Sequence, residues 1–303
     1  MAALLFLGGC AGARVRESGA PVTDLRALPK IDVHAHYRTD NPDLVPALAA
    51  WNVRAVLVNV TGGERQIDRK WRDFQALGAA HPERFVLVAT FDPFRFQESD
   101  FVPKVIEQLR ADIAAGAKGV KVWKDIGMEL KDADGRYVQI DHPKFQPIWD
   151  FLVEQGVPVM AHIGEPRAAW RPLDQNDPHF WYYSNNPQYH AYKHPEIPRH
   201  EEIIAARDRW LARNPKLTVV AMHLASLEFD VDEVARRLDA YPNLYVETAA
   251  RINDLAMQPS AKVRTFMVRY QDRVMWGTDF GEGAVSRTGL ETSFGQHWRY
   301  YGG

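Results

Sequence analysis

The stretch IDVHAHYRTD, residues 31–40, places two histidines on either side of one alanine, directly after an apolar β-branched run. In an extended strand successive side chains face opposite ways, so His34 and His36 share one face while Ala35 takes the other. Neutral imidazole is a good ligand for zinc and similar divalent ions. The pair by itself is weak evidence for a metal site, since the same spacing also arises by chance.

Short apolar runs, rich in valine and bounded by Pro, Gly or Asn, recur along the chain, and longer segments of helical period separate them. The expected strands are Ile31–His36, Ala55–Val60, Phe85–Phe91, Gly119–Trp123, Val157–His162, Leu217–His223, Leu244–Glu247 and Val274–Thr278. The expected helices are Asp43–Ala50, Glu64–Ala80, Phe101–Ala115, Pro143–Gln155, Glu201–Arg213, Val231–Ala240 and Pro259–Tyr270. Several helices end in Gly or Asn just before the next run, as is usual ahead of a buried parallel strand.

This alternation predicts an α/β protein with a parallel sheet, and eight such units predict a closed (β/α)8 TIM barrel. The alternative is a doubly wound open sheet. Such a sheet normally has a glycine-rich phosphate turn after its first strand, where this chain has His-Ala-His-Tyr. We therefore expect a single barrel domain over residues 29–303.

Two insertions interrupt the repeat. Glu129–Ile140 contains Asp134-Gly135 between short alternating segments, which predicts a small hairpin after the fourth strand. Glu165–His200 is a long loop after the fifth strand, crowded with Trp, Tyr, His and Pro, and we expect it to overhang the barrel mouth. After the eighth strand, Phe280–Gly303 shows no clear helical period, so the barrel is expected to lack its last outer helix.

The composition is that of a soluble globular protein, with 303 residues, 46% hydrophobic and 25% charged. The 37 basic and 39 acidic residues are spread along the chain and give a net charge of −2, so no footprint for nucleic acid exists. A small molecule is the expected partner, and homo-oligomerisation stays open. The single cysteine excludes a disulfide scaffold and a thiolate metal site.

That cysteine, Cys10, ends the short apolar run MAALLFLGGC, and Leu7-Gly8-Gly9-Cys10 resembles a bacterial lipobox. Residues 1–28 are then expected to form a signal segment and a tether, with the protein in the bacterial cell envelope as a lipoprotein. The lipid would be its only membrane contact. No Lys or Arg precedes the run, so the alternative is a chance apolar N-terminus on a cytoplasmic protein.

Three further apolar strands close on a polar residue. PVMAHIGEP reaches His162, TVVAMHLAS reaches His223 and RVMWGTDF reaches Asp279. In a parallel barrel all these strand ends meet at one rim, together with His34 and His36. Independent core histidines are the alternative for any one residue, but five residues at four matching strand ends favour one site.

The order H-x-H, then Lys, His, His and Asp at strands one, four, five, six and eight resembles the amidohydrolase superfamily of metal-dependent barrels. IDVHAH and GTDF resemble most its amidohydrolase-related (amidohydrolase 2) branch, which also contains aromatic-acid decarboxylases. The resemblance covers Pro29 to Phe280. It implies one divalent metal ion, expected to be zinc, and a non-ligand catalytic histidine, His223. The implied metal ligands are His34, His36, His162 and Asp279.

The residue chemistry agrees with that reading. Three imidazoles and a carboxylate leave room for a water molecule whose pKa the metal lowers. Asp279 would ligate the metal and carry the proton of the water to the leaving group, while His223 would hold or polarise the scissile carbonyl, or only orient a ligand.

Lysine and arginine side chains leave more alternatives open. Lys121 is the candidate for a carboxylated bridge to a second metal, with Lys124 nearer the strand end. A structural lysine or a contact to a substrate carboxylate is preferred. Glu165, Arg167 and Arg251 are candidate substrate contacts. The alternative for the arginines is a solvated surface charge.

Aromatic residues populate the same long loop, namely Trp170, Trp181, Tyr182 and Tyr183. They suit a flat or carboxylated ligand, or simple packing of the loop on the barrel rim.

The expected function is a metal-dependent hydrolase of an amide, ester or lactone that uses metal-activated water. The first alternative is a non-oxidative carboxy-lyase of a small aromatic or unsaturated acid. The second is a non-catalytic, lipid-anchored binding protein, against which the complete ligand set argues.

Overall fold

The computed structural model describes residues 24–37, 40–61, 66–281 and 286–302. Its eight strands form one sheet in the order β1 to β8, and every neighbouring pair is parallel. The strands are β1 (Lys30–Ala35), β2 (Val53–Val58), β3 (Phe85–Thr90), β4 (Ala117–Val122), β5 (Val159–Ala161), β6 (Val219–Ala221), β7 (Leu244–Glu247) and β8 (Val274–Met275). All eight lie within or beside the expected segments, and the predicted TIM barrel is confirmed.

Hydrogen bonds between the segments around β1 and β8 close the barrel. The N–H of Val33 donates to the carbonyl oxygen of Trp276 at 3.0 Å, and that of His36 donates to Phe280 at 2.8 Å. The N–H of Asp279 in turn donates to the carbonyl oxygen of His34 at 2.8 Å. The closure therefore holds the paired histidines and Asp279 side by side.

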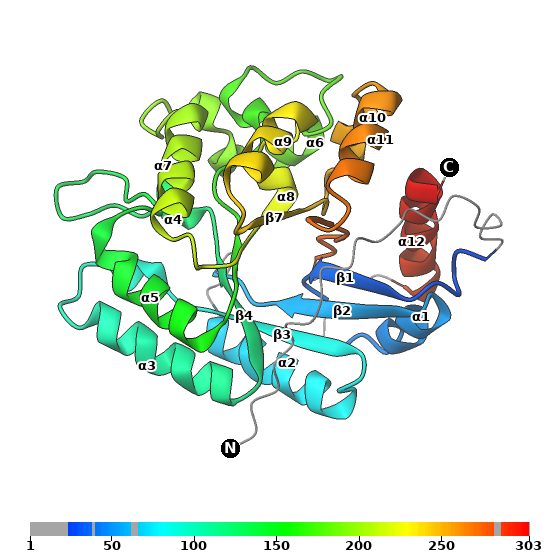
Figure 1. Ribbon diagram of the computed structural model, residues 1–303, viewed down its shortest axis with the longest axis horizontal. Coiled ribbons are helices and arrows are strands. Elements are labelled where there is room, and N and C mark those ends of the chain that lie inside the picture. Colours follow the sequence, from blue (N-terminus) through cyan, green and yellow to red (C-terminus); the bar gives the residue numbers. More distant parts are fainter. Residues whose placement is uncertain (1–23, 38–39, 62–65, 282–285, 303) are drawn as a thin grey trace.

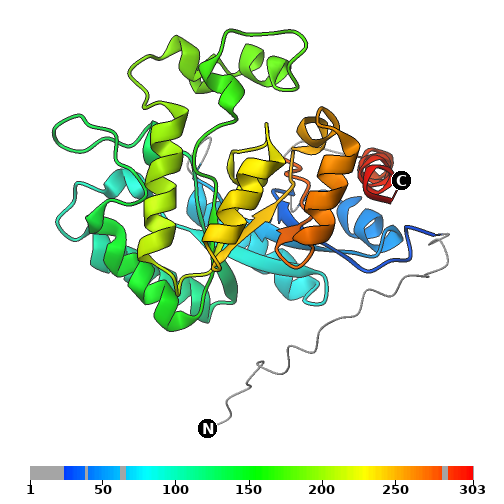
Figure 2. The ribbon, with the colours of Figure 1, turned by 45° about the horizontal axis from the view of Figure 1, so that its top comes forward.

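Helices cover the outside of the barrel (Figures 1 and 2). The α-helices are α1 (Leu44–Ala50), α2 (Ile67–Ala80), α3 (Phe101–Ala114), α4 (Asp125–Met128), α5 (Gln146–Gln155), α6 (Phe180–Asn185), α7 (His200–Arg213), α8 (Met222–Ala225), α9 (Val231–Ala240), α10 (Ile252–Ala256), α11 (Ser260–Arg269) and α12 (Arg287–Gly302). Short 3₁₀ turns are η1 (Pro93–Arg95), η2 (Pro143–Phe145), η3 (Arg167–Trp170), η4 (Pro187–Tyr189) and η5 (Ala191–Lys193). The seven expected helices are present, with ends shifted by a few residues.

The expectation that the last outer helix is missing was wrong. The C-terminal segment forms α12, which packs beside α1 (Figures 1 and 2). Leu290 and Phe294 are fully buried against Trp51 and its neighbours. The helical period was hard to see because few apolar residues of α12 face the barrel and two glycines interrupt them, Gly289 and Gly295.

Side-chain alternation separates an inner from an outer apolar layer. The inner layer is the small cluster Val58, Val88, Met160, Val220 and Met222, which fills the barrel. The residues next to them in sequence pack outward, such as Leu57, Ala161 and Ala221. Polar residues take the inner positions nearer the C-terminal ends of the strands, which leaves room there for a site.

The two insertions have the expected places. A single antiparallel bridge between Lys131 and Tyr137 marks the hairpin after β4. The long loop after β5 carries η3, α6, η4 and η5. Within the described ranges no helix is long and apolar enough to cross a bilayer. Cys10 and the expected signal segment up to residue 23 lie outside the described residues.

Candidate metal centre

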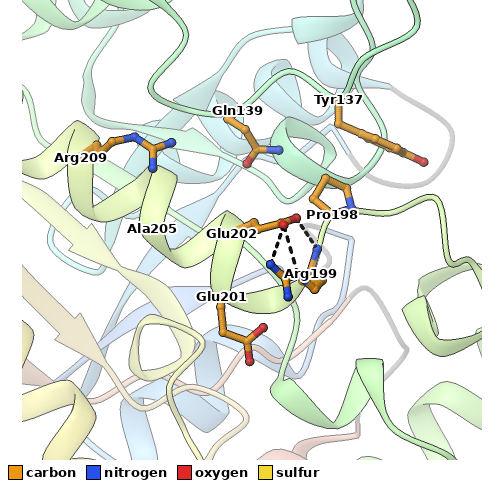
Figure 3. A pocket seen from close by; sticks show the side chains of 8 residues that line it. All are labelled: Tyr137, Gln139, Pro198, Arg199, Glu201, Glu202, Ala205 and Arg209. Carbon is orange, nitrogen blue, oxygen red and sulfur yellow. Dashed lines mark hydrogen bonds and ion pairs between the residues drawn. The ribbon is translucent and has the colours of Figure 1, made fainter.

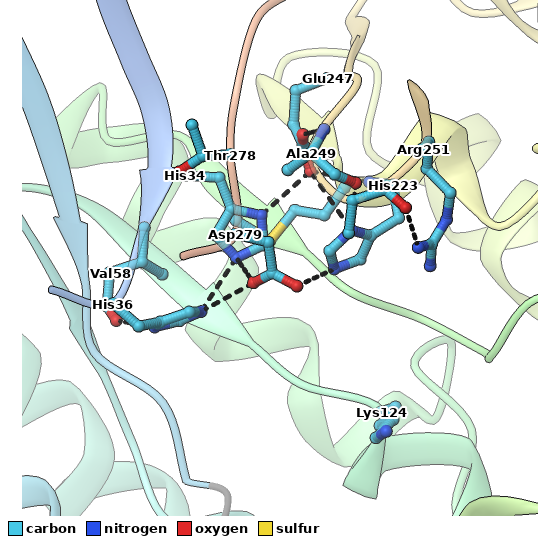
Figure 4. Close-up of polar contacts among 12 residues, drawn as sticks. His34, His36, Val58, Lys124, His223, Glu247, Ala249, Arg251, Thr278 and Asp279 are labelled. Carbon is cyan, nitrogen blue, oxygen red and sulfur yellow. Dashed lines mark hydrogen bonds and ion pairs between the residues drawn. The ribbon is translucent and has the colours of Figure 1, made fainter. Parts of the chain in front are cut away.

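At the end of β1, His34 and His36 turn one nitrogen each toward the same point. Nδ1 of His34 lies 3.1 Å from a carboxylate oxygen of Glu247, and Nδ1 of His36 lies 2.8 Å from the carbonyl oxygen of Val58. Each oxygen accepts a hydrogen bond from Nδ1–H, so each ring in its neutral form keeps a lone pair on Nε2. The two Nε2 atoms lie 3.0 Å apart (Figure 4).

Asp279, just after β8, adds a carboxylate to this pair. Its backbone has a φ of 60°, a left-handed conformation that is uncommon outside glycine. Oδ1 lies 3.3 Å from Nε2 of both His34 and His36. Burial by itself would raise the pKa of Asp279, but the imidazoles of His34 and His223 hold it well below its usual value. Lone pairs this close repel each other unless a proton or a cation lies among them, so the donor set fits a divalent metal ion.

His223, which the sequence placed at the end of the sixth strand, lies instead in a left-handed turn after β6. α8 holds the turn's first residues, and the backbone from His223 to Ser226 has φ between 54° and 61°. Such a run without glycine is costly and needs support from its surroundings. The hydroxyl of Ser226 donates to the carbonyl oxygens of Ile163 and Gly164 at 3.0 and 2.9 Å, and Arg207 donates to a carbonyl oxygen of the turn.

The turn presents the His223 ring to the metal ligands. Its Nδ1 lies 2.9 Å from the carbonyl oxygen of Ala249, so the neutral ring offers Nε2 as an acceptor. Nε2 lies 4.0 Å from Oδ2 of Asp279, and the ring centroid is 4.9 Å from that of His34. Burial, assisted by the charge of Arg251, lowers the pKa of His223 to about 3, so the ring is neutral at pH 7.

Glu247, at the end of β7, connects these histidines and is absent from the residues that the sequence singled out. Its Oε1 accepts from Nδ1 of His34 at 3.1 Å and from the N–H of His223 at 2.7 Å, and Oε2 accepts from Ala249. The side chain is fully buried. A Cβ on Gly277 would come within 3.0 Å of Glu247, so this glycine leaves the space. The signal was available, because Glu247 is another polar residue closing an apolar strand.

His162 lies on the other side of His223, with ring centroids 4.4 Å apart. Burial, with the neighbouring imidazole of His223, lowers the pKa of His162 well below its usual value. Its Nε2 is buried and has no hydrogen-bond partner among the described residues. A buried nitrogen without a hydrogen-bond partner is suited to bind a metal ion.

Lys121 points into the barrel from β4, as the alternation of its strand predicts. It is 1% exposed, and its ammonium contacts the thioether of Met222. The part of the chain that the structure describes offers it no carboxylate within ion-pair distance. Burial lowers the pKa of Lys121 to about 8. Its charge also helps to lower the pKa of His34 and His162.

Five of these groups line one cavity of about 860 Å³, and His223 and Glu247 lie outside its lining. The paired histidines, His162, Lys121 and Asp279 line its floor, and α2 lines one wall. The opposite wall carries Trp123, Lys124, Tyr182 and Tyr189 from the end of β4 and the long loop. The predicted overhang of this loop is therefore present at the site.

The candidate substrate contacts lie outside this lining. Glu165 pairs with Lys124 behind the wall, and Arg167 stacks on Phe229, 3.5 Å from the ring centroid. Arg251 is buried and donates to the carbonyl oxygen of Ala250 at 2.8 Å. Burial lowers the pKa of Arg251, but the nearby carboxylates of Glu228 and Asp254 outweigh it and raise this pKa. None of these three side chains is a solvated charge that lines the cavity.

The aromatic residues of the long loop divide between packing and the cavity. Trp170 donates from Nε1 to the carbonyl oxygen of Pro198 at 3.0 Å, and Trp181 is 73% exposed. Tyr183 is buried and donates to Glu165 at 3.1 Å. Tyr182 alone of the four lines the cavity.

A second depression lies apart from these residues, between the hairpin insertion and the start of α7 (Figure 3). This groove of about 580 Å³ is lined by Tyr137, Gln139 and polar residues of α7. Glu202 accepts from Arg199 there at 3.0 Å. None of the predicted site residues lines it.

Known proteins resemble this chain in sequence and in fold. A family model described as Amidohydrolase matches residues 31–280. No curated protein matches the chain significantly.

Solved structures share the fold at low sequence identity. A 2,6-dihydroxybenzoate decarboxylase from Rhizobium is 14% identical with a TM-score of 0.53, over 86% of this chain and 91% of the other. A provisionally assigned amidohydrolase from Staphylococcus aureus is 14% identical with a TM-score of 0.53, over 84% and 88%. A dihydroxybenzoic acid decarboxylase from Polaromonas, which binds manganese, is 14% identical with a TM-score of 0.50, over 90% and 96%.

Proposed function

We propose that this chain, which belongs to the amidohydrolase family, is a divalent-metal-dependent hydrolase of an amide, ester or lactone bond. The position of Asp279 carries the proposal. One of its oxygens lies 3.3 Å from Nε2 of both His34 and His36, and the other lies 4.0 Å from Nε2 of His223. A single carboxylate thus faces the metal-binding nitrogens and a neutral histidine at once.

His34, His36, His162 and Asp279 would hold the ion. A bound divalent ion supplies a Lewis acid that lowers the pKa of a water molecule toward neutrality. Three imidazoles and one carboxylate suit zinc, although manganese is the ion named for the Polaromonas protein.

The residues of the chain then account for the proton transfers. Water adds to the carbonyl carbon, Asp279 takes its proton, and the same proton goes to the leaving nitrogen or oxygen as the old bond breaks. His223 offers an acceptor nitrogen, so it can accept a hydrogen bond from the water or from the substrate. From the sequence, His223 was expected to hold or polarise the scissile carbonyl, or only to orient a ligand. Lys121 supplies positive charge for the oxyanion.

The second candidate is a non-oxidative carboxy-lyase, and Lys121 is the observation that favours it. A buried ammonium without a carboxylate partner among the described side chains suits the carboxylate of an acid substrate. Two of the structures with the same fold are decarboxylases of dihydroxybenzoates. In this candidate an acidic group protonates the carbon that loses carbon dioxide.

One activity screen separates the two candidates. Purified protein loaded with zinc, and separately with manganese, is offered amides, esters and lactones, and in parallel hydroxybenzoates, with the Asp279→Asn variant as the blank. We expect hydrolysis products above that blank. Carbon dioxide release from hydroxybenzoates without any hydrolysis would replace the proposal with the carboxy-lyase, and no turnover in either panel would favour a binding protein.

A further inference from the structure

Lys124 is a buried cation in the wall of the cavity, apart from the metal ligands (Figure 4). It is 2% exposed. Its Nζ lies 3.6 Å from the ring centroid of Tyr189, 4.9 Å from that of Trp123 and 5.4 Å from that of Tyr182. The face of an aromatic ring attracts a cation, so these three rings favour the charged form of the lysine.

Glu165 compensates the burial of this charge from behind the wall. It accepts from Lys124, and its other oxygen accepts from the hydroxyl of Tyr183 at 3.1 Å. Glu165 is itself 2% exposed and does not line the cavity. Burying a charge is costly unless the charge is paired, and Glu165 supplies that pairing. Both side chains are buried, but Lys124 lines the cavity and its acidic partner does not.

The groups that do face the cavity here are hydrogen-bond donors. An ammonium has three N–H groups, and Glu165 and Tyr182 accept two from Lys124, the latter at 3.0 Å. Since the Tyr182 oxygen accepts that bond, its own O–H is left to donate. Burial, with Glu165 nearby, raises the pKa of Tyr182, so the hydroxyl stays protonated. Two donors side by side match the two oxygens of a carboxylate.

The walls beside these donors are flat and aromatic. The rings of Tyr182 and Tyr189 are parallel, with centroids 6.2 Å apart. The Trp123 ring lies near both His162 and Lys124, since its centroid is 6.5 Å from that of the His162 ring and 4.9 Å from Nζ of Lys124. A planar body between the metal ligands and Lys124 would lie along this ring.

We propose that Lys124 and Tyr182 form a subsite for a substrate carboxylate that lies away from the bond that reacts. The substrate is then a small, flat acid whose reacting group faces Asp279 and whose remote carboxylate is held in the aromatic wall. This proposal rests on the proposed function for the identity of the reacting end, but the subsite itself is a matter of binding.

Two probes with the same aromatic ring test the subsite by binding alone. Benzoate has one carboxylate, which the metal centre can take, whereas isophthalate has a second carboxylate across the ring. Isothermal titration calorimetry on the metal-loaded protein should show isophthalate binding about 10- to 100-fold more tightly than benzoate, the value of one charge-assisted hydrogen bond. Equal affinities, or no measurable binding of either probe, would overturn the proposal.

Variants assign the preference to Lys124. Lys124→Met alone leaves Glu165 buried and unpaired, so the decisive variant is Lys124→Met with Glu165→Gln, which removes both charges. It should reduce the preference for isophthalate to within about twofold, and Tyr182→Phe should reduce it by about 2- to 10-fold. Circular dichroism and a thermal melt establish that each variant is folded. A folded double variant with the full preference would refute the subsite.

Lys144→Met is the matched control. Lys144 is a half-buried lysine that also lies over an aromatic ring, 4.8 Å from the centroid of Phe96, but outside the cavity. Its replacement should leave the preference for isophthalate intact, and a loss as large as in the double variant would show that the effect is unspecific.

The two proposals fail separately. If the wild-type protein hydrolyses a substrate but the double variant keeps the full preference for isophthalate, the subsite is rejected. If the double variant loses the preference but the screen finds no hydrolysis, only the hydrolase is rejected.

Discussion

At the scale of single residues, the candidate centre depends on which nitrogen of each histidine carries the proton. Glu247 and the carbonyl oxygen of Val58 hold the protons of His34 and His36 on Nδ1. The Nε2 lone pairs are then aimed at one point before any ion arrives. Glu247 and Val58, which are not proposed ligands, would thereby orient the proposed metal ligands in advance.

Asp279→Asn should lower kcat by about 10²- to 10⁴-fold, because the amide cannot accept the proton of water. The measurement is the steady-state rate on whichever substrate the screen identifies. Asp73→Asn, at the mouth of the same cavity, serves as the control and should keep its rate. Retained activity in the Asp279 variant would reject the mechanism in both its forms.

Glu247→Gln should weaken metal affinity by about 10- to 100-fold. The amide would orient the His34 ring less firmly, and the negative charge beside Nδ1 of His34 would be lost. Competition with a chromogenic chelator measures the affinity. Asp112→Asn on α3 is the control, because Asp112 is also a buried carboxylate but lies outside the cavity. Equal losses in both variants would mean that the effect is on general stability.

At the scale of elements, two segments decide whether the rim is formed. The left-handed turn after β6 aims His223, and α12 covers the seam where β1 meets β8. Phe294 of α12 packs against Trp276 and Phe280, with ring centroids 6.0 Å away in each case. Those two residues accept the closing hydrogen bonds from Val33 and His36. The C-terminal helix therefore supports the same backbone that holds Asp279.

Phe294→Ala should lower the free energy of unfolding by about 3–5 kcal/mol, the usual cost of emptying a fully buried phenylalanine site. Chemical denaturation monitored by circular dichroism gives the value. Val268→Ala on α11, where the side chain is 57% exposed, should change it by less than about 0.5 kcal/mol. A loss below about 1 kcal/mol at Phe294 would show that α12 is dispensable for the barrel.

At the scale of the whole molecule, the barrel gathers buried charges that the unfolded chain would expose to water. Metal content and the pH dependence of stability both report on them.

The purified protein should contain about one divalent ion per chain, as elemental analysis by mass spectrometry would show. Because the ion binds only the folded state, its removal with EDTA should lower Tm, and free ion at a thousandfold excess over Kd restores about 4 kcal/mol. Two ions per chain would instead revive Lys121 as a carboxylated bridge. In that event Lys121→Met would bring the count back to one.

Stability should also depend on Asp125, which accepts from the hydroxyl of Thr61 at 2.6 Å. Burial raises the pKa of Asp125 to about 7 in the folded protein, from an ordinary value of 3.8. The folded chain therefore holds this proton more tightly than the unfolded chain does. The free energy of unfolding should fall as the pH rises from about 4 to 7, by up to about 1.4 kcal/mol per pH unit, and then level off.

Asp125→Asn should flatten that slope, and denaturation curves at a series of pH values measure it. Asp150→Asn, on the exposed face of α5, is the control and should leave the slope as it is. An unchanged slope in the Asp125 variant would assign the pH dependence to other buried acids.

The sequence by itself determined the repeat of strands and helices, the barrel and the rim. Each strand is a local apolar run and each helix a local period, so both are visible without knowledge of their neighbours. The four strand ends with histidine or aspartate were also visible, because strand order in a parallel barrel places them on one rim.

Only the tertiary structure decided how these residues act. The acceptor nitrogen of His223 depends on Ala249, the orientation of His34 on Glu247, and the ion pair of Lys124 on Glu165. In each case the partner is between 26 and 213 residues away in the chain. Hydrogen bonds across such separations leave no local pattern, and the left-handed turn and α12 likewise owe their form to what packs against them.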